Sequence, residues 1–262
     1  MGPHNTTLVA VRVDERDAGH VAHVTVNNPG QHNALGRRGK EELITAFTAL
    51  AQDDTLRVAV LTGAGDKAFI AGADIAEMKD IDLAGAEDVS TKIHLACDAI
   101  RRLPVPVIAR VNGYCLGAGM EIAAACDMRV GGEHAKFGMP EVKFGIPSGM
   151  EACLLPGLIG WGKTRELVFT GELIDAHEAH RCGFLDWLTP AAELDAAVEH
   201  WVAAILAAGP RAIRIQKALC ADWERMSIKD AVQQGIRAMV EARMTDEPKR
   251  LMQAFVDRKK NG

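Results

Sequence analysis

The chain of 262 residues lacks a basic excess, paired cysteines and long apolar stretches. Its net charge of −5 disfavours nucleic acid as a partner, because such binding depends on a basic face. Its six cysteines include no Cys-x-x-Cys pair, which predicts reduced, mostly buried thiols inside the cell. No apolar run approaches the ~18 residues of a membrane-spanning helix, and residues 1–7 lack the features of a signal peptide. We expect a cytoplasmic protein without a membrane partner.

Several common site motifs are also missing. Residues 63–68 mimic a dinucleotide-binding turn, yet the chain stays extended at Phe69 instead of opening a helix. His177 and His180 are three residues apart, whereas the metalloprotease helix places its histidines four apart. Ser148 does not lie in a Gly-x-Ser-x-Gly frame, and no Walker loop is present. The sequence therefore predicts neither a nicotinamide cofactor nor a metal.

The order of expected elements indicates the fold class. Apolar residues make up 48% of the chain and charged residues 25%, as is usual for a globular protein able to bury a sizeable core. Strands and helices are mixed in the first 140 residues, and only helices are expected after Pro147. The expected strands are 9–13, 24–26, 57–62, 107–111, 128–130 and 135–137, and the expected early helices are 37–51, 82–102 and one ending near 125. This order predicts an α/β core followed by a helical region.

Two glycine-bearing segments, residues 69–75 and 112–121, carry the strongest functional signal. Each is typical of a strand that runs into a loop or a helix start, with small residues where the backbone must approach something closely. Unpaired amide groups at such places can donate to an oxyanion, and two of them from separate segments form a hole for one developing negative charge. We therefore expect an oxyanion hole built from the backbone.

Two glutamates stand beside these segments. Glu121 lies in the first turn of an apolar helix, where burial opposes its ionisation and the helix N-terminus favours it. These opposed influences predict a pKa suited to proton transfer. Glu141 follows Pro140 and precedes a loop at 145–147 that is a plausible pocket rim. Asp74 is interpreted first as the cap of a short helix that reaches Met78.

The glycine segments and their surroundings together resemble the crotonase (enoyl-CoA hydratase/isomerase) family. The resemblance is collinear from about residue 7 to the C-terminus, and it rests on residues 60–78, 106–127 and 137–141, with support from 33–35 and 169–172. It implies an α/β fold, a crotonase-like spiral of ββα units with an all-helical C-terminal region. Residues 1–190 would form the core with the acyl-CoA site, and residues 191–262 a helical oligomerisation region.

The resemblance also implies an activity, the addition of water to a 2-enoyl-CoA thioester. The backbone amides of Ala73 and Ala118 would form the oxyanion hole. Glu121 would orient and deprotonate the water, and Glu141 would deliver a proton to the α-carbon. Further substrate-binding positions would be Ala71, Gly72, Asp74, Ile75 and Gly117. The family pattern implies no metal, no cofactor besides the coenzyme A of the substrate, and a homotrimer or a dimer of trimers.

Three departures from the common hydratase pattern leave the acyl group and the reaction type open. The segment between Glu141 and Pro147 is one residue shorter, and Ala76 replaces a lysine that often holds the phosphates. Residues 150–154 read Met-Glu-Ala-Cys-Leu instead of Gly-Gly-Thr-Gln-Arg. Glu151 could be a third pocket carboxylate or could face solvent, and the filled space there predicts a short, polar or branched acyl group. Isomerase, hydrolase, decarboxylase and non-catalytic acyl-CoA-binding proteins remain alternatives.

Overall fold

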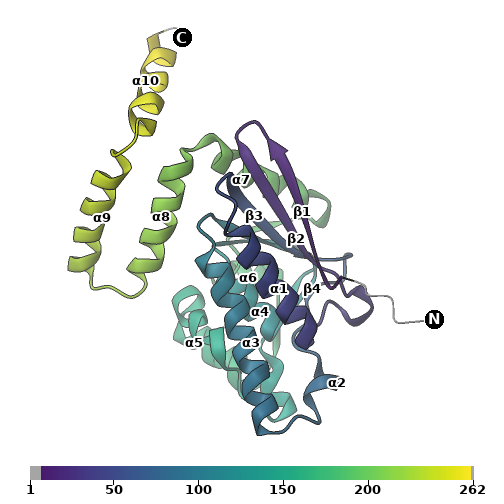
Figure 1. Ribbon diagram of the computed structural model, residues 1–262. Helices are drawn as coiled ribbons and strands as arrows, with labels where there is room; N and C mark the ends of the chain where they lie inside the picture. Colours follow the sequence, from purple (N-terminus) through teal and green to yellow (C-terminus); the bar gives the residue numbers. More distant parts are fainter. Residues whose placement is uncertain (1–6, 261–262) are drawn as a thin grey trace.

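The computed structural model describes residues 7–260, without the side chain of Lys260, and contains two sheets (Figure 1). The first sheet has the strand order β1-β2-β3-β5-β7-β10. Its strands are β1 (Val9–Arg16), β2 (Gly19–Val26), β3 (Leu56–Gly63), β5 (Val107–Val111), β7 (Met128–Gly132) and β10 (Trp187–Thr189). β1 and β2 form the predicted antiparallel hairpin, and every other pairing in this sheet is parallel.

The second sheet is smaller and determines where the site lies. Its order is β4-β6-β8-β9, with β4 (Ala68–Ile70), β6 (Tyr114–Leu116), β8 (Lys136–Gly138) and β9 (Leu173–Asp175). β4, β6 and β8 run parallel, whereas β9 is antiparallel to β8. Parallel strands end at the same edge of a sheet. The segments that follow β4, β6 and β8 therefore meet at one edge.

Both faces of the first sheet are covered. Val58 and Val60 face the helix α7 (Leu194–Ala207), while the alternate residues Ala59 and Leu61 join the main core. That core includes apolar side chains of α1 (Arg37–Leu50), α3 (Leu83–Arg102) and α4 (Ala118–Ala125). The remaining helices before α7 are η1 (Pro29–Gln31), α2 (Ile75–Met78), η2 (Pro140–Phe144), η3 (Met150–Leu154), α5 (Leu155–Thr170), α6 (Ala176–Arg181) and η4 (Ala191–Glu193).

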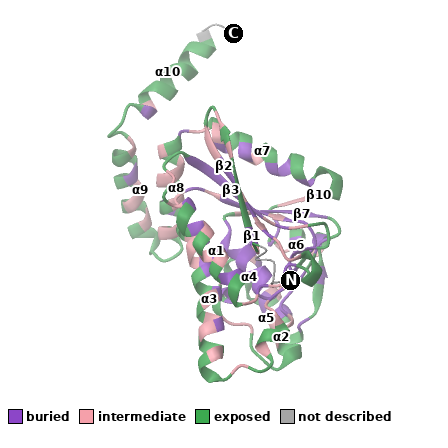
Figure 2. Ribbon diagram, turned by 45° about the vertical axis from the view of Figure 1, so that its right-hand side comes forward, coloured by how far each residue is buried: buried purple, intermediate pink, exposed green. Residues whose placement is uncertain are grey.

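The last three helices lie at one side of this body, and α10 reaches beyond it (Figure 1). α8 (Pro210–Trp223) and α9 (Ile228–Ala242) form a helical hairpin, and α10 (Glu247–Lys260) continues beyond it. Most of α9 and α10 is exposed (Figure 2), including a row of large apolar side chains on α9. That row consists of Ile228, Val232, Ile236, Met239 and Val240. A division of the chain at residue 190 remains a prediction.

The structure confirms the α/β class with a helical C-terminal region and corrects two details. The expectation of helices only after Pro147 is wrong, because β9 and β10 lie in that part of the chain. Each has three residues, too few to show an alternating pattern in the sequence. All six cysteines are free, but only Cys97, Cys115 and Cys126 are buried. The expectation of mostly buried thiols therefore holds for half of them.

Candidate active site

The two glycine segments lie side by side at the edge of the second sheet. β4 pairs with β6 through Ala68–Tyr114 and Ile70–Cys115, so the chain leaves both strands at neighbouring points. Gly119, in the first turn of α4, lies directly against the backbone carbonyl of Ile70, where a Cβ would overlap. The start of α4 therefore abuts the end of β4, as an oxyanion hole from two segments requires.

The two predicted oxyanion donors have free amides in this arrangement. The segment of Ala73 is held by Leu35, whose N–H donates to the Gly72 carbonyl at 2.9 Å and whose carbonyl accepts from Asp74 N–H at 3.2 Å. The N–H of Ala73 makes no backbone hydrogen bond within the described residues. Ala118 is the first residue of α4, so its N–H has no acceptor within the helix. Neither amide donates to a backbone carbonyl among the described residues.

Glu141 lies beside the second segment. It is in η2, which follows β8, and its carboxylate is so close to Gly117 that a Cβ on Gly117 would overlap Oε1. Gly117 also has a φ of 50°, in the left-handed region that favours glycine. Ser148 Oγ donates to Glu141 Oε2 at 2.7 Å. The structure thus holds this carboxylate from two sides, next to the start of α4.

Glu121 lies in α4, all of whose residues are buried, and Figure 2 shows this helix in the colour of buried residues. The exposed fraction of Glu121 is 2%, and its Oε1 accepts one hydrogen bond, from the backbone N–H of Ala152 at 3.0 Å. Burial raises the pKa of Glu121 to about 8, which the Ala152 amide opposes and the charges of Glu141 and Glu151 reinforce. Of the two opposed influences expected from the sequence, burial dominates. Glu121 carries a proton at neutral pH.

Glu151 is the third carboxylate of this cluster. Of the two alternatives left open by the sequence, an exposed Glu151 is wrong, because only 8% of its side chain is accessible. Its Oε1 lies 2.7 Å from Nδ1 of His94, on α3. Sequence reasoning identified none of the partners His94, Ser148 and Ala152: His94 and Ala152 are 57 and 31 residues from the carboxylates they bind, and Ser148 is seven residues from Glu141. No local pattern predicts such contacts.

The other predicted binding positions surround the first segment. Asp74 caps α2 as expected, and its Oδ1 accepts from Ala76 N–H at 2.9 Å. Ala71 donates its N–H to the His32 carbonyl, Gly72 has a φ of 109°, and Ile75 is half exposed. Contacts of these residues with a substrate remain predictions.

The pair His177 and His180 does not form a metal site with its surroundings. Within residues 7–260 no group of three or more His, Cys, Asp or Glu side chains is arranged to hold a metal ion. His180 instead uses Nδ1 to contact the Leu185 carbonyl at 3.0 Å.

No helix in the described part of the chain is both long and apolar enough to cross a bilayer.

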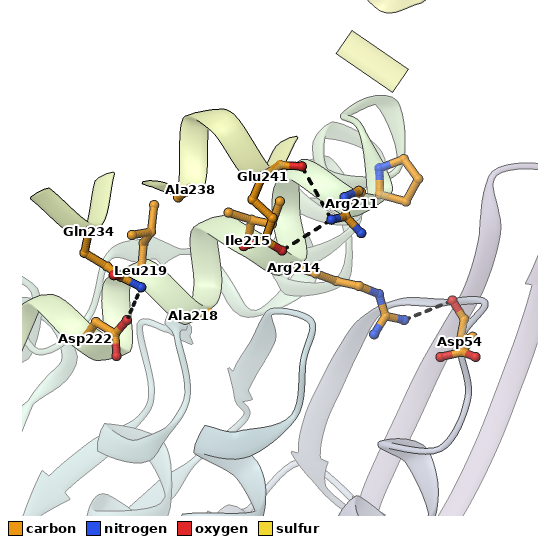
Figure 3. A pocket seen from close by; sticks show the side chains of 11 residues that line it. Asp54, Arg211, Arg214, Ile215, Ala218, Leu219, Asp222, Gln234, Ala238 and Glu241 are labelled. Atoms are coloured by element: carbon orange, nitrogen blue, oxygen red, sulfur yellow. Dashed lines mark hydrogen bonds and ion pairs between the residues drawn. The ribbon is translucent and has the colours of Figure 1, made fainter. Parts of the chain in front are cut away.

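A separate hollow lies between α8 and α9 (Figure 3). Its volume is about 450 Å³, and none of the predicted site residues lines it. Its polar side chains contact one another or nearby backbone: Arg211 pairs with Glu241 at 3.3 Å, and Arg214 donates to the Asp54 carbonyl at 3.0 Å. These contacts fasten the helical hairpin, and we assign the hollow no part in the chemistry.

Comparison with known proteins shows the family of the chain. The model of the enoyl-CoA hydratase/isomerase family matches residues 16–262. The chain belongs to this family. It is 35% identical over 236 residues to a crotonyl-CoA hydratase of Syntrophomonas wolfei, an alignment that covers 90% of this chain and 91% of the relative. It is 34% identical over 243 residues to a short-chain-enoyl-CoA hydratase of Clostridium acetobutylicum, covering 92% and 93%.

Solved structures confirm the fold. The crystal structure of an enoyl-CoA hydratase from Bacillus anthracis superposes with a TM-score of 0.90 at 32% identity, covering 95% of this chain and 96% of that one. An enoyl-CoA hydratase from Mycobacterium smegmatis gives a TM-score of 0.90 at 30% identity, with the same coverage. The crotonase resemblance is therefore confirmed, and the chain is that of an enzyme.

Proposed function

We propose that the enzyme is an enoyl-CoA hydratase, which adds water across the double bond of a 2-enoyl-CoA thioester. The observation that carries this proposal is the placement of two carboxylates, Glu121 and Glu141, beside two segments with free amides. Hydration needs one group to take a proton from water and one to give a proton to carbon. The names of the two bacterial relatives support the same reaction.

The backbone would supply the electrostatic part of catalysis. In this proposal the thioester carbonyl accepts hydrogen bonds from the N–H groups of Ala73 and Ala118. Polarisation of the carbonyl makes the β-carbon electrophilic, and the same two donors stabilise the enolate formed by attack. One oxyanion donor contributes roughly 3–4 kcal/mol to such a transition state.

The burial of Glu121 favours an exchange of the roles implied by the resemblance. Its pKa of about 8 leaves it protonated at neutral pH, so it is poised to give a proton to the α-carbon. Glu141, half-buried and held by Ser148, is then the group that takes a proton from water as the hydroxide adds to the β-carbon. A later proton transfer from Glu141 to Glu121 restores the starting state. No proton is gained or lost overall.

The residues near the carboxylates suggest the size of the acyl group that the enzyme accepts. Met150 and Glu151 occupy space where many hydratases have glycines, so we propose a short, polar or branched acyl chain. The names of the relatives, crotonyl-CoA and short-chain-enoyl-CoA hydratase, support a short one. The remaining contacts of the substrate would be with Ala71, Gly72, Asp74, Ile75 and Gly117.

The proposal also covers the cofactor, the location and the oligomeric state of the enzyme. The enzyme would need no cofactor besides the coenzyme A of its substrate and would work in the cytoplasm. Residues 191–262 would serve oligomerisation, as a homotrimer or a dimer of trimers. The apolar row on α9 and the exposed Phe255 of α10 support this, because a partner subunit would cover them.

Product analysis tests the proposed function. Incubation with crotonyl-CoA should give a product heavier by one water, with its thioester intact, and longer straight chains should react more slowly. Free coenzyme A would indicate a hydrolase, loss of carbon dioxide from a carboxylated acyl-CoA a decarboxylase, and a shifted double bond in a 3-enoyl-CoA an isomerase. Any of these in place of hydration contradicts the proposal.

A further inference from the structure

The helix α2, which begins two residues after the proposed oxyanion donor Ala73, has little packing of its own. None of its four residues is buried (Figure 2), and its N-cap Asp74 accepts hydrogen bonds from amides of α2 itself. The neighbouring helix α1, by contrast, buries Leu43 and Phe47 completely in the main core. A segment with few buried apolar contacts opens easily. The position of α2 therefore depends on its bonds to other elements.

Glu77 makes such a bond, from α2 to the start of α1. Its Oε2 accepts from the backbone N–H of Arg37, the first residue of α1, at 2.7 Å. Gly36, the N-cap of α1, has no side chain that could make this bond, and a Cβ there would overlap the carboxylate of Glu77. The carboxylate thus lies directly against the N-terminus of α1, where unpaired amides favour a negative group. Glu77 caps a helix other than its own.

Leu35 and the start of α1 together hold the segment of Ala73 at three points. Leu35 donates to the carbonyl of Gly72, before the donor, and accepts from the N–H of Asp74, after it. The bond to Glu77 is the third, further along the chain. Because the Gly72 carbonyl and the Ala73 N–H share one peptide plane, the first bond sets the direction of the donor. The two later bonds keep the segment against α1.

We propose that Glu77 is a positioning residue, which holds the amide of Ala73 in place for the thioester carbonyl by tying α2 to the start of α1. This role rests on the proposed function and deepens it. An oxyanion donor is effective only when it lies roughly 3 Å from the developing charge. A displacement of about 1 Å can cost roughly 100-fold in rate.

Steady-state kinetics with crotonyl-CoA test this role. Glu77→Ala should lower kcat by roughly 10- to 100-fold with KM nearly unchanged, because the other contacts of the substrate are kept. Glu77→Gln keeps an oxygen that can accept from Arg37 and should retain most of the activity. Asp175→Ala is the matched control, since it removes the side-chain cap of another helix, α6. It should lower the Tm as Glu77→Ala does and keep the wild-type kcat.

A second variant displaces Glu77 without removing it. A Cβ at Gly36 overlaps the end of the flexible Glu77 side chain, and the φ of Gly36, −72°, suits alanine. Gly36→Ala should therefore lower kcat as Glu77→Ala does. The double variant should be no slower than Glu77→Ala alone, because both changes break the same contact.

A spectroscopic measurement reports on the oxyanion hole without any reaction. Butyryl-CoA has no double bond to hydrate, and a ¹³C label at its thioester carbonyl makes the stretching frequency of that carbonyl visible. Binding to the wild type should lower this frequency, because hydrogen bonds from the two amides polarise the carbonyl. Glu77→Ala and Gly36→Ala should lower it less, whereas Glu77→Gln and Asp175→Ala should match the wild type.

The two measurements decide the role of Glu77. A wild-type kcat or a wild-type carbonyl frequency in Glu77→Ala would overturn it, and so would an equal loss of kcat in Asp175→Ala. Glu77 is exposed, so its replacement keeps the fold. If the wild type hydrates no enoyl-CoA, the proposed function fails, and the carbonyl frequencies alone then support or overturn the role of Glu77.

Discussion

Gly117 leaves no room for a side chain beside the carboxylate of Glu141, since a Cβ at Gly117 would overlap Oε1. The residue that follows, Ala118, carries one of the two proposed oxyanion donors. The start of α4 and the carboxylate on η2 are therefore fixed relative to each other by direct contact between backbone and side chain. A water molecule held by Glu141 would lie close to the polarised thioester.

Gly117→Ala should lower kcat/KM for hydration by roughly 100-fold or more, because it displaces Glu141 and strains the left-handed backbone. Gly145→Ala is the control, because Gly145 also has a positive φ, 79°, but has nothing within 4 Å of an added Cβ. Steady-state kinetics and the Tm of both variants check this. Equal losses of activity would show that strain, and not contact with Glu141, is responsible.

Ala73→Pro should remove one oxyanion donor and raise the barrier to hydration by roughly 3–4 kcal/mol, whereas Ala73→Gly should be mild. The free N–H of Ala73 motivates the pair, since its loss breaks no backbone hydrogen bond among the described residues. Kinetics with crotonyl-CoA would be compared after circular dichroism has established that both variants fold. The assignment of the amide is wrong if the two variants behave alike.

The rate of hydration should fall as pH rises through about 8, the pKa of Glu121, because the proposed proton donor ionises there. The opposite assignment, with Glu121 as the base, requires the rate to rise over the same interval. A profile of kcat/KM against pH in buffers of constant ionic strength distinguishes the two, since this ratio reports the free enzyme.

Glu121→Gln should stabilise the protein at alkaline pH. Folding raises the pKa of Glu121 to about 8, so the free energy of unfolding decreases as pH rises from the ordinary value of a glutamate towards 8. The full effect is roughly 4–5 kcal/mol. Thermal unfolding at about pH 9 should give a higher Tm for Glu121→Gln than for the wild type, and a smaller difference at about pH 5. An equal Tm difference at both values would show that Glu121 does not titrate abnormally.

The sequence predicted those parts of the molecule that depend on local pattern. The hairpin, the strand at 107–111 and the two glycine segments have alternating or small residues whose consequences are short-range. β9 and β10 were missed because each is three residues long and exists through pairing with a distant strand.

In the candidate site, too, features that depend on local sequence pattern were predicted, and contacts made by the fold of the chain were not. The burial of Glu121 was expected from the apolar residues around it in α4. The contacts of Ser148 with Glu141 and of His94 with Glu151 were not, because they join elements through the fold of the chain. The resemblance implied which glutamate would act as the base, and the reverse roles are proposed from the burial of Glu121 in the folded protein.

The most direct test is the hydration of crotonyl-CoA by the wild type, Glu121→Gln and Glu141→Gln. The wild type should form the hydrated thioester, and each variant should be slower by ~10²–10⁴ with binding of the CoA ester nearly unchanged. Loss of the enoyl absorbance gives the rates, and calorimetry with a saturated acyl-CoA gives the affinities. Near-wild-type rates in either variant would contradict the assignment of two carboxylates to one reaction.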